Sequence, residues 1–231
     1  MLLPVHTSHG LPDDSAAADD QSSSVWQSKL TRQHMVLIWT FGMVASFIDE
    51  ALPLYCMMFL AMGEVEIGRV LSIAEIFFAS LQYLVFSTIT QRLGSQRAIW
   101  MGAMFGSLPT VFFAFAGAWD DGKLWLASIL TILKLFHSTF FTNMAMSVNK
   151  TVDTSRRAKL NALIMTGNSV GRGLGPSLAG MAVTLSVHWS KSNITVASAL
   201  IWGPIPLLFG LIVSRKSYAL ATLLKNQDSS S

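Results

Sequence analysis

Residues 35–61 read MVLIWTFGMVASFIDEALPLYCMMFLA, an apolar stretch with two adjacent acids, Asp49 and Glu50, in its interior. A helix needs about 20 mostly apolar residues to cross the roughly 30 Å hydrocarbon core of a bilayer. Within that core only helices and closed barrels pair every backbone polar group. Five similar stretches follow. We therefore predict an all-α, polytopic membrane protein with six transmembrane helices, over residues 35–61, 67–90, 98–118, 124–148, 159–187 and 194–214.

The composition agrees with this class. Of the 231 residues, 52% are hydrophobic and 13% are charged, whereas soluble domains carry about 25% charged residues. The net charge of +3 arises from cations between the apolar stretches, so we expect no nucleic-acid partner. Cys56 is the only cysteine, which excludes an intrachain disulfide and suggests a buried, small apolar side chain. The five histidines are scattered, so we expect neither a metal nor a cofactor.

The ends of the chain differ from its middle. Residues 1–33 are polar and low in complexity, which predicts a disordered cytoplasmic segment. Residues 34–216 form the predicted six-helix transmembrane domain, and residues 217–231 form a cytoplasmic tail.

Basic residues predict the orientation in the membrane. With six crossings, eleven lysines and arginines fall on one side and three on the other. The excess of cations marks the cytoplasmic side, so both termini are predicted to be cytoplasmic. The pattern leaves open whether the membrane is the plasma membrane or an internal, vacuolar one. The larger set comprises Lys29, Arg32, Arg92, Arg97, Lys150, Arg156, Arg157, Lys159, Arg215, Lys216 and Lys225, and the smaller set Arg69, Lys123 and Lys191.

Ionisable groups within the predicted helices are candidates for a functional site, because each costs at least a few kcal/mol in hydrocarbon. They could line a polar cavity and carry protons, or form buried ion pairs that fix helix packing. For Asp49 and Glu50 we favour the cavity. His137 could titrate near neutral pH or hydrogen-bond in a packed interface. The candidates for the solute and proton pathway are Asp49, Glu50, Glu75, Lys134, His137 and Arg172.

Glycines mark a face for close helix packing in the fifth predicted helix. Gly167, Gly171 and Gly175 recur every four residues and are followed by Pro176 and Gly180. Small residues at this spacing allow the backbone of a neighbouring helix to approach. Residues 167–171 also match the Gly-x-Ser-x-Gly pattern of serine hydrolases, but that motif requires a strand-to-helix turn, so we reject it.

Three segments resemble the C-terminal half of a major facilitator superfamily transporter. Residues 87–97 are similar to the family's cytoplasmic gating loop, in which Arg92 and Gly94 match and Arg97 closes the segment. Ser87 and Gln91 stand where the family has glycine and an acid. The other two segments, residues 156–163 and 175–180, resemble the entry to the eleventh family helix and the Gly-Pro segment that follows it.

Two shorter segments suggest a subfamily. Residues 49–54 and 68–73 resemble parts of the seventh and eighth helices of zinc-induced-facilitator-like proteins and drug:proton antiporters. The resemblance implies that the six spans are helices seven to twelve. The third and sixth spans, which carry no charge, would then be the peripheral ninth and twelfth helices.

The resemblance implies transport of a small solute by alternating access, as proton-coupled secondary transport such as antiport. Because a complete member has twelve helices, the expected partners besides lipid, solute and protons are a missing N-terminal six-helix half or a second copy of this chain. Residues 1–33 would be the central linker. The alternative is a truncated, non-transporting scaffold or regulatory partner. An intramembrane enzyme using Ser169 and His137 is disfavoured. The sequence identifies neither the solute nor the direction of transport.

Overall fold

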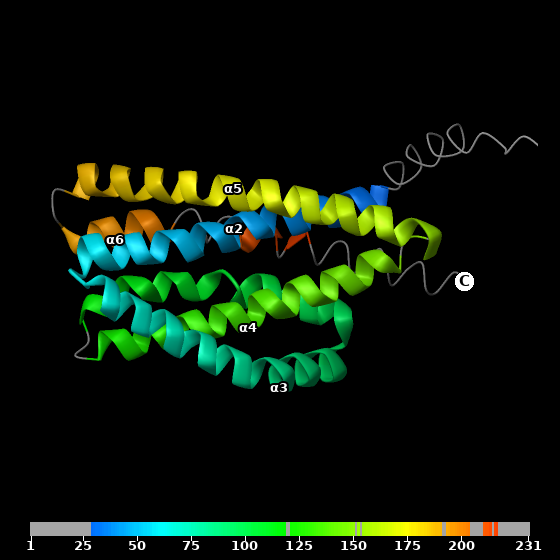
Figure 1. Cartoon of the computed structure of the whole chain (residues 1–231), viewed down its shortest axis with the longest axis horizontal. Coiled ribbons are helices and arrows are strands. Elements are labelled where there is room, and N and C mark those ends of the chain that lie inside the picture. The colour runs from blue at the N-terminus through cyan, green and yellow to red at the C-terminus, as the bar shows by residue number, and fades with distance from the viewer. Residues whose placement is uncertain are drawn as a thin grey trace, which may run out of the picture.

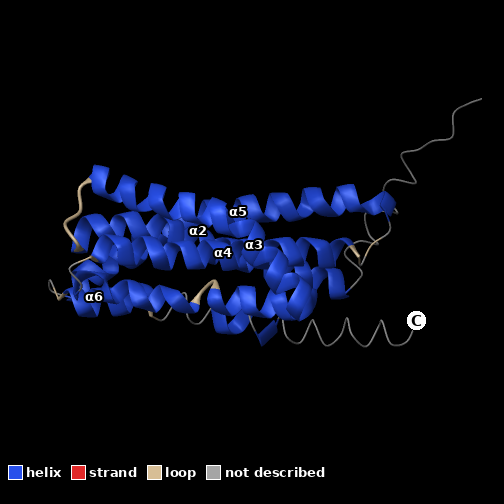
Figure 2. Ribbon diagram, turned by 90° about the horizontal axis from the view of Figure 1, so that it is seen from below, coloured by secondary structure: helices blue, strands red, loops and turns tan. Residues whose placement is uncertain are grey.

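The computed structural model describes residues 29–118, 121–150, 152, 154–190, 193–203, 210–213 and 215–216. Every element in these ranges is helical, and the long helices lie side by side (Figures 1 and 2). The all-α class is therefore confirmed. Of the predicted disordered segment 1–33, residues 1–28 lie outside the described residues and residues 29–33 are helical. The predicted tail, 217–231, lies outside the described residues.

Five α-helices and two 3₁₀ segments make up the described chain. The first helix begins at Lys29, five residues before the predicted boundary at residue 34. It therefore includes the polar residues that precede the apolar stretch. Within the predicted sixth helix, 194–214, the structure describes residues 194–202 and 210–213 as helical. Residues 215–216, just beyond it, are helical as well. The elements are α2 (Lys29–Phe59), α3 (Glu64–Phe105), η1 (Leu108–Ala118), α4 (Gly122–Asn149), η2 (Thr154–Arg156), α5 (Arg157–Ser190) and α6 (Ile194–Trp202).

The predicted second and third helices meet at Gly94 without an intervening loop. Gly94 has φ 76° and ψ 159°, while the residues on either side are helical. This region of backbone space is essentially restricted to glycine, because a Cβ would clash there. Figure 1 shows the chain turning back beyond this point. Two helical arms thus stand where the separate helices 67–90 and 98–118 were predicted, and they join directly at Gly94. The second arm is α-helical to Phe105 and continues as the 3₁₀ segment Leu108–Ala118.

Contacts with α4 show that the two arms run in opposite directions. Before Gly94, Glu75 contacts Lys134 and Thr90 contacts Asn143, so the residue numbers rise together. After Gly94 the order is reversed. The Cβ position of Gly102 meets Phe140, and Trp125 donates its indole N–H to the carbonyl of Phe112.

The predicted count of six crossings is not confirmed. Among the described residues, three helical stretches are long and apolar enough to cross a membrane: Leu30–Phe59, Glu64–Ala116 and Gly122–Asn149. The second of these contains both arms around Gly94. The fifth predicted helix forms over its whole length, as Arg157–Ser190, but its glycines, serines and asparagines lower its hydropathy.

α5 lies against α2 through its glycines. The Cβ position of Gly167 would fall 2.0 Å from the Trp39 ring, and that of Gly171 3.1 Å from the Trp39 carbonyl oxygen. The Cβ position of Gly175 would fall 2.4 Å from Ser46 Oγ. Gly180, in contrast, has nothing within 4 Å. Pro176 lies inside the helix and is exposed, and the helix continues through it.

Two hydrophobic clusters fill the bundle. One contains residues 44–56 of α2 and 126–133 of α4, together with residues of α3, η1, α5 and α6. The other contains residues 35–41 of α2 and 140–148 of α4, together with residues at the C-terminal end of α3 and the start of α5. The stretch of α4 between Leu133 and Phe140 belongs to neither cluster, and it carries two of the ionisable residues of that helix, Lys134 and His137.

Candidate functional site

An ion pair joins α3 to α4 at the level between the two hydrophobic clusters. Lys134 Nζ donates to Glu75 Oε1. The lysine side chain is 22% exposed and the glutamate side chain 53% exposed. The pair is therefore within reach of solvent or solute, and it is not sealed in the core.

Charges from two further helices face this pair. Asp49 of α2 lies within electrostatic range of Lys134, Glu75 and Arg172, and the last of these belongs to α5. We call Asp49, Glu75, Lys134 and Arg172 the charge cluster. Four predicted candidates from four helices thus come together, although their sequence positions span more than 120 residues.

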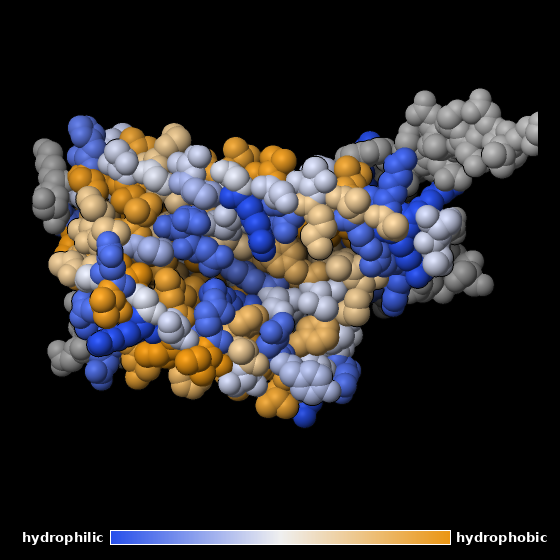
Figure 3. All heavy atoms as spheres, in the orientation of Figure 1, coloured by the Kyte–Doolittle hydropathy of each residue, from blue (hydrophilic) through white to orange (hydrophobic). Residues whose placement is uncertain are grey.

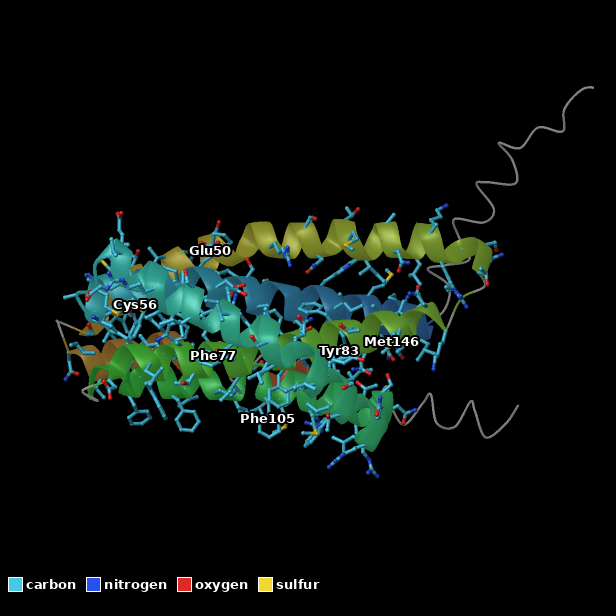
Figure 4. The ribbon with its side chains drawn as sticks, turned by 60° about the horizontal axis from the view of Figure 1, so that its bottom comes forward. Glu50, Cys56, Phe77, Tyr83, Phe105 and Met146 are labelled. Atoms are coloured by element: carbon cyan, nitrogen blue, oxygen red, sulfur yellow. The ribbon has the colours of Figure 1, made fainter. Side chains whose placement is uncertain are left out.

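Hydrophilic residues gather in a band on one face of the molecule (Figure 3). Figure 3 shows hydrophilic residues between the α2–α5 pair and the α3–α4 pair, with apolar residues above and below. Glu50 is exposed and follows Asp49 directly (Figure 4). Neighbouring residues of a helix point about 100° apart, so Glu50 faces a different direction from Asp49.

His137 occupies a different environment. Its side chain is buried, and its Nε2 hydrogen-bonds to the carbonyl oxygen of Gly106, at the end of α3. Because a carbonyl accepts only, Nε2 carries the proton of this bond. The ring also packs edge-on against Phe41, with a centroid distance of 5.2 Å. The structure thus places His137 in a packed interface, one of the two environments that its sequence position allowed.

The residues of the predicted gating loop lie around the turn of α3. Arg92, Gly94 and Arg97 are all exposed. The turn of α3 lies toward the end of the bundle where α2 and α5 begin (Figure 1). The unusual backbone of Gly94 gives this segment its shape.

Several uncharged polar residues near the charge cluster were not among the predicted candidates. Gln82 Nε2 donates to Ser138 Oγ at 2.8 Å and so joins α3 to α4, at a position one turn beyond Lys134 on α4. Asn168 lies one turn before Arg172 on α5, with Oδ1 buried. The sequence signal that could have identified them is an amide side chain within an otherwise apolar helix.

No group of three or more histidine, cysteine or acidic side chains within the described ranges could hold a metal ion. The site consists of carboxylates, a lysine, an arginine and amides. Such groups can bind a polar solute and exchange protons, and they require no cofactor to do so.

Comparison with known proteins identifies the family. The family model described as Major Facilitator Superfamily matches residues 2–176. The chain belongs to the major facilitator superfamily. Neither the search of curated proteins nor that of solved structures returned a match.

Membership in this superfamily establishes the general activity. The protein is an integral membrane transporter and not an enzyme. The match does not extend to a subfamily, so the resemblance to zinc-induced-facilitator-like proteins and drug:proton antiporters has no support from it.

Proposed function

We propose that this transporter moves a small solute by alternating access and couples the movement to protons through the charge cluster. The observation that carries the proposal is the Glu75–Lys134 ion pair, which joins two helices and has a second carboxylate, Asp49, within range of the same lysine. A cation shared by two carboxylates can change partner when one of them takes up a proton.

The coupling step follows from this arrangement. In the described state, Lys134 is bound to Glu75. When a proton binds the Glu75 carboxylate, the attraction to Lys134 falls, and the lysine is freed to approach Asp49. The contact between α3 and α4 then weakens while a contact between α4 and α2 forms. Secondary antiport results if the solute and the proton compete for the same cluster.

The proposal that this chain is half of a transporter rests on the exposed apolar surface of α3 and η1. In the apolar window of Glu64–Ala116 only 11% of the residues are buried, against 61% and 56% in the windows of α2 and α4. Phe77 and Tyr83 carry exposed aromatic rings along α3 (Figure 4). We propose that the chain crosses the bilayer six times and pairs with an N-terminal six-helix half or with a second copy, with lipid covering the remaining apolar surface.

The proposed orientation places both termini in the cytoplasm. The start of α2, the end of α4 and the start of α5 lie at one end of the bundle (Figure 1). Together with the connection between α4 and α5, these segments carry six of the eleven cations that predict the cytoplasmic side.

Vesicles containing the full chain and a trapped pH-sensitive dye provide the test. Small solutes would be added singly from a library, and proton movement recorded. At least one solute should change the internal pH. Lys134→Met and Asp49→Asn should abolish the change while inserting normally, and Lys123→Met, which breaks the exposed Lys123–Glu66 pair at the end of the bundle, should retain it.

The alternative, a non-transporting scaffold, predicts different results. No solute would then move protons in the unmodified chain, although the protein would insert and associate with a partner. Normal proton movement in both the Lys134→Met and Asp49→Asn variants would contradict the assignment of the site.

A further inference from the structure

Asn168 and Arg172 are polar side chains on the same side of α5. They are four residues apart, so their Cβ atoms lie about 5–6 Å apart on one side of the helix. Within the described ranges, no carboxylate lies within ion-pair distance of the Arg172 guanidinium. The buried Oδ1 of Asn168 has no hydrogen-bond partner in these ranges. Arg172 is exposed, so a solute can reach it.

Gly42 of α2 sets the direction of the Asn168 amide. The position of a Cβ on Gly42 would fall 2.1 Å from Asn168 Oδ1, so only a hydrogen atom of glycine leaves room for that oxygen. Oδ1 is buried there. A Cα–H group is a weak donor, so an amide oxygen fits against it better than an amide N–H group does. The amide nitrogen, with its two donors, is therefore directed away from Gly42.

A second contact fixes the backbone at Arg172. Ser46 Oγ donates to the carbonyl oxygen of Arg172 at 3.1 Å. The close approach of Gly171 and Gly175 to α2 holds the same turn of α5. These contacts fix the backbone from which the Arg172 side chain extends.

The chemistry of these donors selects a carboxylate. An arginine fork binds a carboxylate through two parallel hydrogen bonds. The Asn168 amide can add a third. Asp49, which lies within range of Arg172, would repel a simple anion but attract a neighbouring ammonium group.

We propose that the transported solute is a small zwitterion of the amino-acid type, with its carboxylate on Arg172 and Asn168 and its ammonium group facing Asp49. This assignment rests on the proposed function and adds the substrate class. It also gives Lys134 and Glu75 a separate role, because they remain paired while the zwitterion binds.

Binding can be measured without transport. The full chain in lipid nanodiscs would be titrated with each standard amino acid, with tryptophan fluorescence as the readout, since Trp39 lies against Gly167 beside the site. At least one amino acid should bind. Its amide, which lacks the carboxylate, and the corresponding acid without the amine should each bind about tenfold more weakly, as expected for the loss of a charged hydrogen bond.

Substitutions identify the donors. Arg172→Gln should weaken binding about a hundredfold and Arg172→Lys about tenfold, because lysine keeps the charge but lacks the fork. Asn168→Leu should weaken binding about tenfold. Two exposed positions provide controls, Arg69→Gln on α3 and Asn161→Leu at the start of α5, and both should bind as the unmodified chain does.

Three results would overturn the proposal: no amino acid binds, amides bind as well as acids, or Arg172→Gln binds normally. Failure of the coupling mechanism looks different. Lys134→Met should lose proton movement but keep amino-acid binding, so the two hypotheses are separable.

Discussion

The α2–α5 interface differs in chemistry from the interface that the first arm of α3, before Gly94, makes with α4. The second arm of α3 also packs on α4 through a glycine, Gly102. α5 lies on α2 through Gly167, Gly171 and Gly175, whose absent side chains let the two backbones approach. Along α3 and α4, polar side chains meet at successive levels. These pairs are Glu66–Lys123, Glu75–Lys134, Gln82–Ser138 and Thr90–Asn143.

The difference indicates which pair of helices is suited to move. Contacts of a glycine face depend on close packing and cannot be exchanged for others without opening a gap. A polar side-chain pair can be replaced by bonds to water, solute or another side chain at little net cost. We therefore expect α2 and α5 to remain together during the transport cycle while α3 and α4 change partners.

The largest effect is expected at the α2–α5 interface. Gly175→Leu places a side chain where Ser46 Oγ lies 2.4 Å and the Ser46 carbonyl carbon 2.9 Å from the Cβ position. Forcing the helices apart should lower the free energy of unfolding by about 3 kcal/mol or more. Reversible unfolding in mixed micelles measures this change.

Gly180→Leu is the matched control, on the same helix and with nothing within 4 Å of its Cβ position. It should leave stability unchanged or raise it slightly, because leucine has the higher helix propensity. Equal effects of the two substitutions would contradict the close-packed description of this interface.

The second prediction concerns His137. His137→Leu removes the hydrogen bond to the Gly106 carbonyl and leaves that oxygen unpaired beside the end of α3. The loss should be about 1–2 kcal/mol. If His137 is a packing residue, the pH dependence of proton movement in vesicles should stay the same. A shift in the pH dependence of proton movement would show that His137 takes part in the proton pathway.

The ion pair of the charge cluster should contribute less to stability than to function. Because both side chains are partly exposed, a double-mutant cycle of Glu75→Gln and Lys134→Met should give a coupling energy of only about 0.2–1 kcal/mol. Unfolding of the two single variants and the double variant measures it. A coupling energy of several kcal/mol would mean that the pair mainly stabilises the contact between α3 and α4 and does not exchange partners readily.

The smallest effect is expected at Gln82. Gln82→Leu removes one hydrogen bond to Ser138, and such bonds between membrane helices contribute about 0.6 kcal/mol. Thr88→Val, at an exposed position on the same arm of α3, provides a control for the change in surface polarity. A loss above that of His137→Leu would show that the α3–α4 interface is less adaptable than its chemistry suggests.

The long apolar stretches of the sequence predicted much of the fold, because few backbone arrangements satisfy their hydrogen bonds within hydrocarbon. The long helices α2, α4 and α5 formed within several residues of their predicted bounds. The turn at Gly94 was not predicted in form. Residues 91–97 are polar and resemble a loop, but the helical conformation persists on both sides of one glycine whose backbone adopts a positive φ.

The candidate site was predictable in composition but not in arrangement. A charge in an apolar helix is costly, and this marked Asp49, Glu75, Lys134 and Arg172 individually. Which of them meet depends on helix rotation, which one sequence does not specify. Glu50 and His137 carried the same signal, but Glu50 is exposed and faces another direction from Asp49. His137 lies within electrostatic range of Lys134, yet it is buried and hydrogen-bonded to the Gly106 carbonyl in a packed interface. Asn168 was missed because an uncharged amide costs less to bury.

Cys56 has a practical consequence. It is the only cysteine of the chain and is buried in one of the hydrophobic clusters. Reporter groups attached through thiols will therefore react at engineered surface positions with little competition. A pair of spin labels on the exposed faces of α3 and α4, and a second pair on α2 and α5, would measure the two interhelical distances in nearly native protein. The two distances would show which pair of helices moves during the transport cycle.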